Sequence, residues 1–490
     1  MIGAAGAGAS AAAFLAVRAG ATVTACDLAG ASPYTVALEA AGIIVEQGHS
    51  PNHVSTPPRP ERLAVTKALT AIDPDHPELA QARRANIPVE SWQQVVADTA
   101  VGRRLVAVAG THGKSTTSGW LVHVLTAAGV DPSAFVGALL PSSLTGGPPG
   151  TARWGGGSTF VVEADEYAGN FDPYRPDVAI LTSAEWDHPD DFADRAAVVD
   201  AFAGWLRHAP AGAVLVANVA DDGVAAVVER LGEWPGQVIA YALVDQAPQR
   251  LGSYARAIAE RFSTGGRPAE SLLGRVTASD RASTTIEIHG LDPLVGPIST
   301  RLVSAGRHNA ANALAVAGAA SALGLRPADI ATGLASFEGV GRRLERKGEA
   351  AGVTVYDDYG HHPTAIRETL AAVRQREPGR RVWAAFEPLT FHRTAAMLDA
   401  FAEVLAGADA VAIADIWAGR DPDTTIASAD RLAAAVAARR PEIPVLAPGS
   451  VEETGDMLAA EVRPGDVVLV MGGGRSYRIG ERLLERLGGK

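Results

Sequence analysis

Residues 104–117, with the sequence RLVAVAGTHGKSTT, decide the fold of this chain. The largely apolar run 104–109 predicts a buried strand, a glycine-bounded turn follows it, and the residues from Lys114 onward begin a helix. A strict phosphate-binding loop has glycine where Val108 stands, but the C-terminal part of the motif, which contacts the phosphates, is retained. Backbone N–H groups at the helix start, the Lys114 ammonium and the Ser115 hydroxyl suit phosphates and Mg²⁺. We therefore predict a nucleoside triphosphate site; the alternative is a plain glycine-rich turn with a solvated lysine.

Length and composition place this strand–turn–helix unit in a large globular chain. A chain of 490 residues is too long for one core and predicts about two to four domains. Hydrophobic residues make up 47% and charged residues 20%, which argues against disordered and fibrous classes. The net charge of −12, without a Lys/Arg-rich tract, predicts neither a nucleic-acid partner nor an anionic membrane partner.

Cysteine content and hydropathy indicate the compartment. Cys26 is the only cysteine, which excludes an intramolecular disulfide and a cysteine-rich metal site and favours a reducing cytoplasm. No run reaches about 18 apolar residues, so we expect no membrane span. The apolar residues 1–17 lack a basic segment before them and are interrupted by glycine, which argues against a signal peptide.

Short apolar runs alternate with Ala/Leu-rich helical stretches along the whole chain, which predicts the α/β class with parallel sheets. We divide the chain into three α/β domains, at 1–99, 100–336 and 337–490. The first and third domains are expected to be Rossmann-like, and the central one a P-loop-type ATPase domain. Strands are predicted at 21–26, 104–109, 160–162, 178–181, 214–217, 353–356, 382–386, 411–414 and 467–471.

The first domain contains a glycine pattern of its own. Residues 6–11 fit G-x-G-x-x-G/A with Gly6 and Gly8, and Asp27 follows at the end of the predicted strand. Such glycines let the backbone approach a pyrophosphate at a helix N-terminus. Three interpretations remain: a phosphate-binding turn for some nucleotide, an NAD site, or close helix packing. The strand that should precede the pattern is missing, because the chain begins only five residues earlier.

Acidic residues follow two strands of the central domain. Residues 161–166 place Glu163 and two further carboxylates at one strand end, and residues 181–188 end in Glu185, Asp187 and His188. Ligands of α/β proteins bind at such strand ends. Together with Lys114 these groups predict Mg²⁺ binding, most strongly by Glu163; the alternative is a solvated acidic loop.

Three further polar stretches lie later in the chain. Residues 306–309 (GRHN) begin an Ala-rich helix and suit an adenine edge, although a capping histidine is the commoner role. Residues 341–343 (GRR) offer guanidinium groups to phosphoryl oxygens. Residues 356–363 combine acids with a histidine pair, which resembles a transition-metal site, but Mg²⁺ prefers oxygen ligands.

Six of these stretches occur in the order found in the Mur ligases, and the chain resembles that family over essentially its whole length. They are residues 110–117, 163–166, 185–188, 306–309, 341–343 and 357–363. The family comprises ATP-dependent amide ligases of peptidoglycan precursor synthesis. The resemblance implies a UDP-sugar domain, a central ATPase domain and a C-terminal domain for the amine. It also implies that ATP phosphorylates the substrate carboxylate and that an amine then attacks the acyl phosphate.

The resemblance implies a role for individual residues. The catalytic residues are Lys114, Glu163, His188 and Arg343. The ATP contacts are Gly110, Thr111, His112, Gly113, Lys114, Ser115, Thr116, His308, Asn309, Arg343 and Asp358, with Asp358 at the ribose. The Mg²⁺ ligands are Ser115, Glu163 and His188. The substrate contacts are Gly6, Gly8, Asp27, Tyr359, His361 and Arg393. The partners are small molecules, and the chain is expected to be a monomer or homodimer.

Departures from the family pattern leave more than one candidate for the amine substrate. The family stretch F-Q-P-H-R-Y-x-R reads FEPLTFHR at 386–393, so Leu389 and Thr390 replace two polar recognition residues, and Ser183 replaces the usual Asn near the end of an earlier strand. We expect L-alanine to be joined to the carboxylate of UDP-N-acetylmuramate. Addition of a tripeptide during cell-wall recycling is the alternative within the family. A nucleotide-binding homologue that does not ligate is the alternative from another class, and an NAD enzyme is a remote third.

Overall fold

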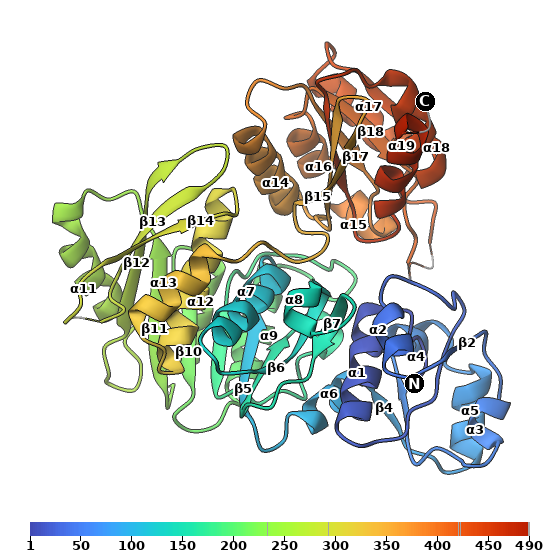
Figure 1. Cartoon of the computed structure of the whole chain (residues 1–490), viewed down its shortest axis with the longest axis horizontal. Helices are drawn as coiled ribbons and strands as arrows, with labels where there is room; N and C mark the ends of the chain where they lie inside the picture. Colours follow the sequence, from blue (N-terminus) through green and yellow to red (C-terminus); the bar gives the residue numbers. More distant parts are fainter. Residues whose placement is uncertain (233, 293, 420, 422, 489–490) are drawn as a thin grey trace.

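The chain forms three α/β lobes in sequence order, seen in blue, in cyan to yellow and in orange to red in Figure 1. The computed structural model describes residues 1–232, 234–292, 294–419, 421 and 423–488. Among the described residues, no helix is long and apolar enough to cross a membrane.

The N-terminal lobe is built from short elements. Its two small parallel sheets pair β1 with β2 and β3 with β4. The strand predicted at 21–26 is shorter and later in the structure, because residues 21–24 are largely exposed and have no strand partner. The elements are α1 (Ala7–Arg18), β1 (Ala25–Asp27), α2 (Val36–Ala40), β2 (Val45–Gln47), α3 (Asn52–Ser55), β3 (Leu63–Val65), α4 (Lys67–Ile72), α5 (Pro77–Arg84), β4 (Val89–Ser91) and α6 (Trp92–Thr99).

A single residue, Ile2, joins the two small sheets. No regular strand precedes α1 in the described residues, but the Ile2 amide donates to the Ala64 carbonyl at 2.9 Å, and Ile2 forms an isolated parallel bridge with Cys26. The Gly3 amide donates to the Cys26 carbonyl at 2.9 Å. The turn that begins α1 is therefore anchored between β1 and β3, although no regular strand precedes it in the described residues.

The central lobe contains a ten-stranded sheet in the order β14-β13-β12-β11-β10-β9-β5-β8-β6-β7. Its middle is parallel, and antiparallel strands close both edges. The strands are β5 (Arg104–Ala109), β6 (Ser133–Leu140), β7 (Gly150–Arg153), β8 (Thr159–Glu163), β9 (Val178–Leu181), β10 (Val214–Asn218), β11 (Gln237–Leu243), β12 (Glu270–Ser279), β13 (Thr284–His289) and β14 (Ile298–Leu302). The helices are α7 (Lys114–Ala127), α8 (Ser142–Thr145), α9 (Arg195–Leu206), α10 (Asp222–Leu231), α11 (Leu251–Arg261), α12 (Arg307–Ala322) and α13 (Pro327–Ala335), with short 3₁₀ turns at Tyr167–Gly169 and Pro248–Arg250.

Each face of the central sheet is buried by helices. Alternate residues of β5 point to opposite faces, so Val106 packs with α7, α12 and α13, and Ala107 packs with α9 and α10. The second face also receives Leu15 of α1 and Val96 of α6 from the N-terminal lobe. Because this core crosses the lobe boundary, the N-terminal lobe is fixed to the edge of the central sheet.

The C-terminal lobe has a six-stranded sheet in the order β15-β16-β20-β17-β18-β19, parallel except at β15. Helices α14, α16 and α17 cover one face, and α18 and α19 cover the other. The elements are β15 (Glu345–Ala350), β16 (Val353–Asp358), α14 (Pro363–Arg376), β17 (Val382–Phe386), α15 (Phe391–Ala396), α16 (Leu398–Leu405), β18 (Ala410–Ala414), α17 (Ala429–Arg439), β19 (Val445–Gly449), α18 (Val451–Glu461), β20 (Val467–Met471) and α19 (Tyr477–Gly488). All strands predicted from residue 104 onward are confirmed.

The junction between α1 and the central lobe gives a stability prediction. A Cβ added at Gly8 would collide with the indole of Trp92, which is held edge-on against Phe135 at 5.1 Å. We expect Gly8→Ala to lower the free energy of unfolding by about 1–3 kcal/mol through overpacking, measured by urea denaturation. The matched control is Gly204→Ala in α9, where an added Cβ meets nothing within 4 Å. The control should gain about 0.5–1 kcal/mol; equal effects of the two changes would contradict close packing at Gly8.

Candidate active site

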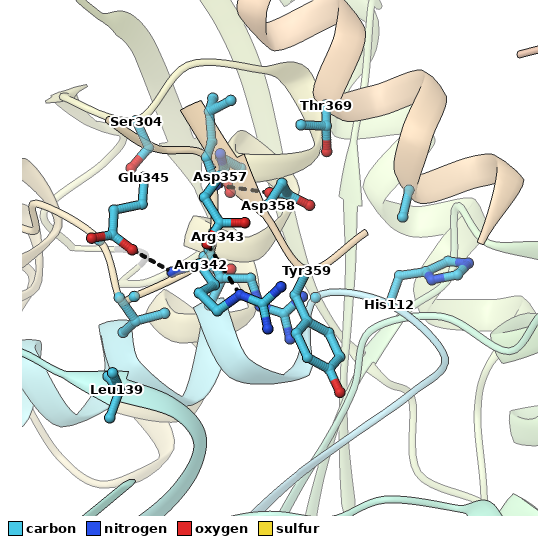
Figure 2. A pocket seen from close by; sticks show the side chains of 18 of the residues that line it. His112, Leu139, Ser304, Arg342, Arg343, Glu345, Asp357, Asp358, Tyr359 and Thr369 are labelled. Carbon is cyan, nitrogen blue, oxygen red and sulfur yellow. Dashed lines mark hydrogen bonds and ion pairs between the residues drawn. The ribbon is translucent and has the colours of Figure 1, made fainter. Parts of the chain in front are cut away.

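A cleft of about 1810 Å³ lies where the three lobes meet. Its lining includes Asp27 of the N-terminal lobe, His112 and Asn309 of the central lobe, and Asp358 of the C-terminal lobe. Figure 2 shows the part formed by Arg342, Arg343 and Tyr359. Predicted site residues more than 300 positions apart in the sequence are thus gathered around one cavity.

The loop between β5 and α7 is held in shape by glycine backbone and by the end of β9. Gly110 has φ +129°, and an added Cβ there would approach the Ser183 amide nitrogen at 2.8 Å and collide with the Thr182 hydroxyl. The Ser183 hydroxyl accepts from the His112 amide at 2.8 Å, and the Thr111 amide donates to the Ser183 carbonyl at 3.1 Å. Ser183, the departure from the family pattern, therefore still supports the loop.

The loop's remaining glycine and threonines have distinct positions. Gly113 has φ +80° just before α7, where a Cβ would lie 2.6 Å from Asn312 Oδ1. The Thr111 hydroxyl donates to the Glu185 carbonyl at 3.1 Å, while Thr116 lines the cleft. Together these contacts leave the N-terminus of α7 open toward the cleft, as phosphate binding requires.

The ammonium of Lys114 lies among carboxylates. Its Nζ is 2.8 Å from Glu166 Oε2 and 3.3 Å from Asp165 Oδ1. Burial opposes its charge, but Glu166 and Asp165 outweigh burial and raise the pKa of Lys114 above its ordinary value. Burial also raises the pKa of Glu166 despite the nearby lysine. Lys114 is therefore a fixed cation at the start of α7.

Ser115 connects the central and C-terminal lobes. Its hydroxyl donates to Glu163 Oε1 at 2.9 Å, and the other Glu163 oxygen accepts from the Gly137 amide at 2.6 Å. Arg343 Nη2 donates to the Ser115 hydroxyl at 2.8 Å from the far side of the cleft. The Arg343 Nε is buried without a hydrogen-bond partner among the described residues. An unsatisfied guanidinium N–H beside the phosphate loop suits an anionic ligand.

His188, predicted as a Mg²⁺ ligand with Ser115 and Glu163, lies beside two further carboxylates. Its ring has a nitrogen within 4.8 Å of carboxylate oxygens of Asp165 and Glu166, and the three form a possible metal-binding set. Sequence reasoning noticed these two acids at a strand end but did not count them as site residues. In this structure Ser115 and Glu163 contact each other, and His188 is grouped with the neighbouring acids.

A second cluster of histidine and carboxylate side chains includes His112 of the loop between β5 and α7. His112 Nε2 is 2.8 Å from Glu185 Oε2, and His362 Nδ1 is 3.7 Å from the same oxygen. Although burial favours the neutral acid, the His112 hydrogen bond lowers the pKa of Glu185 to about 2. Burial lowers the pKa of His362 to about 4. The cluster therefore joins the loop to the C-terminal lobe through an ionised glutamate.

Arg393, predicted as a substrate contact, forms a buried ion pair across the lobes. Its Nε donates to Asp187 Oδ1 at 2.7 Å, and its Nη2 lies 3.2 Å from His188 Nδ1. The side chains are only 3% and 6% exposed, and the Arg393 charge overcomes burial to hold the pKa of Asp187 well below its usual range. Burial, reinforced by Arg393, lowers the pKa of the nearby His361 well below its usual range.

The residues predicted for adenine and ribose lie along the cleft. His308 and Asn309 begin α12 and line it, and the Asn309 side chain donates to the Ala305 carbonyl at 2.6 Å. Asp358 accepts 2.7 Å hydrogen bonds from the Leu344 and Gly360 amides, so its carboxylate already shapes the local backbone.

The predicted substrate residues differ in their surroundings. Asp27 accepts from the Ala5 amide at 3.0 Å, and both it and Gly6 line the cleft. Gly8 faces Trp92 in the packed junction between α1 and the central lobe. This contact favours the helix-packing interpretation of that glycine. Tyr359 lies with the Arg342 and Arg343 guanidinium carbons each 5.0 Å from its ring centroid.

The stretch that departs from the family pattern lies at the end of β17. Glu387 is buried with Oε2 unpaired among the described residues, while Thr390 has φ +61° and caps α15. The glycine turn at 472–474, after β20, packs here: a Cβ at Gly474 would lie 2.9 Å from Glu387 Oε2 and 2.8 Å from the indole of Trp417. The two lost polar positions are thus replaced by an apolar side chain, Leu389, and a helix cap.

Glu387 gives a prediction about pH. Burial raises its pKa from 4.5 to about 7, although the Ser476 amide and the Arg342 charge oppose this. The folded chain therefore holds this proton more tightly than the unfolded chain, and stability falls as the pH rises from about 4.5 to about 7. We expect Glu387→Gln to remove this loss, a gain of at most about 3 kcal/mol at neutral to alkaline pH.

The measurement for this prediction is urea unfolding of both proteins across the acid-to-alkaline range. Glu403→Gln, at an exposed position of α16, is the matched control and should leave the pH profile unchanged. Parallel profiles for wild type and Glu387→Gln would contradict the raised pKa.

The phosphate loop on a parallel sheet, facing cationic side chains from a second lobe, defines an enzyme that uses a nucleotide for group transfer. Family models match along the chain: the Mur ligase family catalytic domain at residues 1–104, the Mur ligase middle domain at 108–320 and the Mur ligase glutamate ligase domain at 342–474. The chain belongs to the Mur ligase family, whose members use ATP.

Individual relatives agree with this assignment. The chain is 36% identical to a UDP-N-acetylmuramate–L-alanine ligase of Frankia casuarinae, covering 99% of this chain and 97% of that protein. It is 35% identical to the ligase of the same name from Roseiflexus castenholzii, covering 100% and 97%. The UDP-N-acetylmuramate–alanine ligase of Thermotoga maritima has the same fold, with a TM-score of 0.76 at 22% identity over 99% of this chain and 97% of that one. A murein peptide ligase of Psychrobacter arcticus gives 0.73 at 24% identity over 100% and 98%.

Proposed function

We propose that this chain joins L-alanine to the carboxylate of UDP-N-acetylmuramate with hydrolysis of ATP to ADP and phosphate, a step of peptidoglycan precursor synthesis. The observation that carries the proposal is the convergence of Lys114, Ser115 and Arg343 at the start of α7, next to a cleft that residues of all three lobes line. Full-length similarity to L-alanine ligases supports the substrates. A cytoplasmic location and a monomeric or homodimeric state remain predictions.

The residues of the cleft suit the two steps of this reaction. In the first step a carboxylate oxygen attacks the γ-phosphorus of ATP, and ADP leaves. This brings anionic groups together, so Lys114 and Arg343 would offset the repulsion and stabilise the charge on the transferring phosphoryl group. In the second step an amine nitrogen attacks the acyl carbon, and phosphate leaves with the oxygen of the mixed anhydride.

The same residues fit magnesium. Glu163 and Ser115 offer hard oxygen donors beside the phosphate loop, and Asp165, Glu166 and His188 form a second set. Bound Mg²⁺ would neutralise the phosphate oxygens. Lys114 already contacts Asp165 and Glu166, so an incoming phosphate would compete with these acids for its ammonium.

The amine site lies at the C-terminal lobe on this proposal. Arg393 and His361 are close to Asp187 and His188 at the boundary with the central lobe, which would bring an amine near the transferred phosphoryl group. The altered Leu389 and Thr390 do not disrupt the backbone here, because Thr390 caps α15 and the Leu389 backbone bridges to Trp417.

A coupled phosphate assay tests the function. We expect phosphate release only when ATP, Mg²⁺, UDP-N-acetylmuramate and L-alanine are all present. Parallel assays in which glycine, other amino acids or a free cell-wall tripeptide replace L-alanine identify the amine substrate. Faster phosphate release with the tripeptide would favour the recycling reaction. ATP binding without phosphate release for any amine would favour a homologue that binds the nucleotide but does not ligate.

A change at Lys114 tests the phosphate site. Lys114→Met keeps the aliphatic length and removes the ammonium, so we expect kcat/KM to fall by at least about 10³-fold. Binding of UDP-N-acetylmuramate, measured by calorimetry, should persist because Lys114 lies outside the N-terminal lobe. Activity above a few percent of wild type would refute the phosphate role.

A further inference from the structure

A cluster of metal-ligating side chains lies in the N-terminal lobe, and none of its members lines the nucleotide cleft. Cys26 comes from β1, His49 from the loop after β2, His53 from α3 and Glu78 from α5. Cys26 is 4% exposed and Glu78 1% exposed, whereas the two histidines are partly accessible. The proposed ligase reaction uses none of these four residues.

The four ligand atoms lie close together. Cys26 Sγ is 3.6 Å from His49 Nδ1 and 3.3 Å from Glu78 Oε2. Glu78 Oε1 is 3.3 Å from His49 Nδ1 and 3.0 Å from His53 Nδ1. The Cys26, His53 and Glu78 ligand atoms all lie within 4.8 Å of one another.

Four of the six separations, at 3.0–3.6 Å, are close to the edges of a tetrahedral metal site. Zinc–sulfur bonds of about 2.3 Å and zinc–nitrogen or zinc–oxygen bonds of about 2.0–2.1 Å give ligand–ligand edges of about 3.3–3.6 Å. One thiolate, two imidazoles and one carboxylate form a donor set that zinc accepts and that Mg²⁺ does not favour. Four protein ligands would also close the coordination sphere, as in structural zinc sites.

The surroundings support metal ligation by His53. Its second ring nitrogen, Nε2, lies 3.1 Å from Glu46 Oε2, so a carboxylate would orient the imidazole whose Nδ1 faces the cluster. A carboxylate behind a metal-bound histidine is the usual outer partner of such a ligand. Glu78 Oε1 also accepts from the Ser50 amide at 3.0 Å, which fixes the carboxylate.

His76 lies next to the cluster. It is 4% exposed, its ring lies 4.5 Å from the His49 ring in an edge-on arrangement, and neither of its ring nitrogens has a hydrogen-bond partner among the described residues.

We propose that Cys26, His49, His53 and Glu78 bind one structural zinc ion that fastens β1, the loop after β2, α3 and α5 to one another. Such a bond would stabilise the part of the lobe around β1, α3 and α5: its strands are three residues long, and its apolar residues form a small cluster apart from the core that the lobe shares with the central sheet. Small folds that cannot build a large core are commonly stabilised by a metal.

The test uses the full chain without a histidine tag, purified under reducing conditions. Mass spectrometry should find about one zinc per chain, and stripping followed by cobalt should produce a thiolate-to-cobalt charge-transfer band with tetrahedral d–d bands. Because Cys26 is the only cysteine, this band in the wild-type chain can arise from that residue alone. Cys26→Ser should abolish the band.

Two substitutions at exposed positions test the site without disturbing the buried core. Glu46→Gln removes the carboxylate behind His53 and should weaken zinc binding about 10–100-fold, whereas the matched control Glu39→Gln should not. Absence of the cobalt charge-transfer band from the wild type would overturn the proposal. Zinc bound without that band would place the metal at another cluster, such as Asp165, Glu166 and His188, and would also overturn it.

Discussion

The buried ion pair between Arg393 and Asp187 is the contact on which the cleft depends. Two charged groups excluded from water attract strongly, and breaking such a pair typically costs about 3–5 kcal/mol because the remaining charge is uncompensated. The pair holds the C-terminal lobe against the end of β9, and this position lets Arg343 reach the Ser115 hydroxyl. The same contact brings His188 beside Arg393. The proposed catalytic groups of two lobes are therefore positioned by this ion pair together with the contacts of His362 to Glu185 and Trp186.

Local charge explains how an acidic chain can bind anionic substrates. The net charge of −12 is distributed over the molecule, but Arg342 and Arg343 line the cleft, and Lys114 and the backbone amides at the start of α7 lie beside it. Before a ligand binds, Asp165 and Glu166 neutralise Lys114, which keeps the buried ammonium charged and fixed.

The features that could be predicted from the sequence are those that a few neighbouring residues determine. The strand 104–109 and its turn were predicted because apolar runs and glycines act over a few residues. The 21–26 strand was placed too early because its apolar residues continue a helix end and carry no alternation that marks the first paired residue. The grouping of His188 with Asp165 depends on how two strand ends meet, and the cluster around Cys26 joins residues from four separate elements. No sequence spacing marks contacts of that kind.

The altered stretch at the end of β17 shows how a family fold can keep its backbone while changing a pocket. Thr390 keeps the helix start by accepting from the Arg393 amide, so Arg393 still points at Asp187. Leu389 removes a polar group, while Glu387 introduces a buried carboxyl in place of the family's glutamine, a change that matters only if the carboxyl is ionised. Because its pKa lies near 7, a cationic group placed beside it would draw the proton away and pair with the carboxylate.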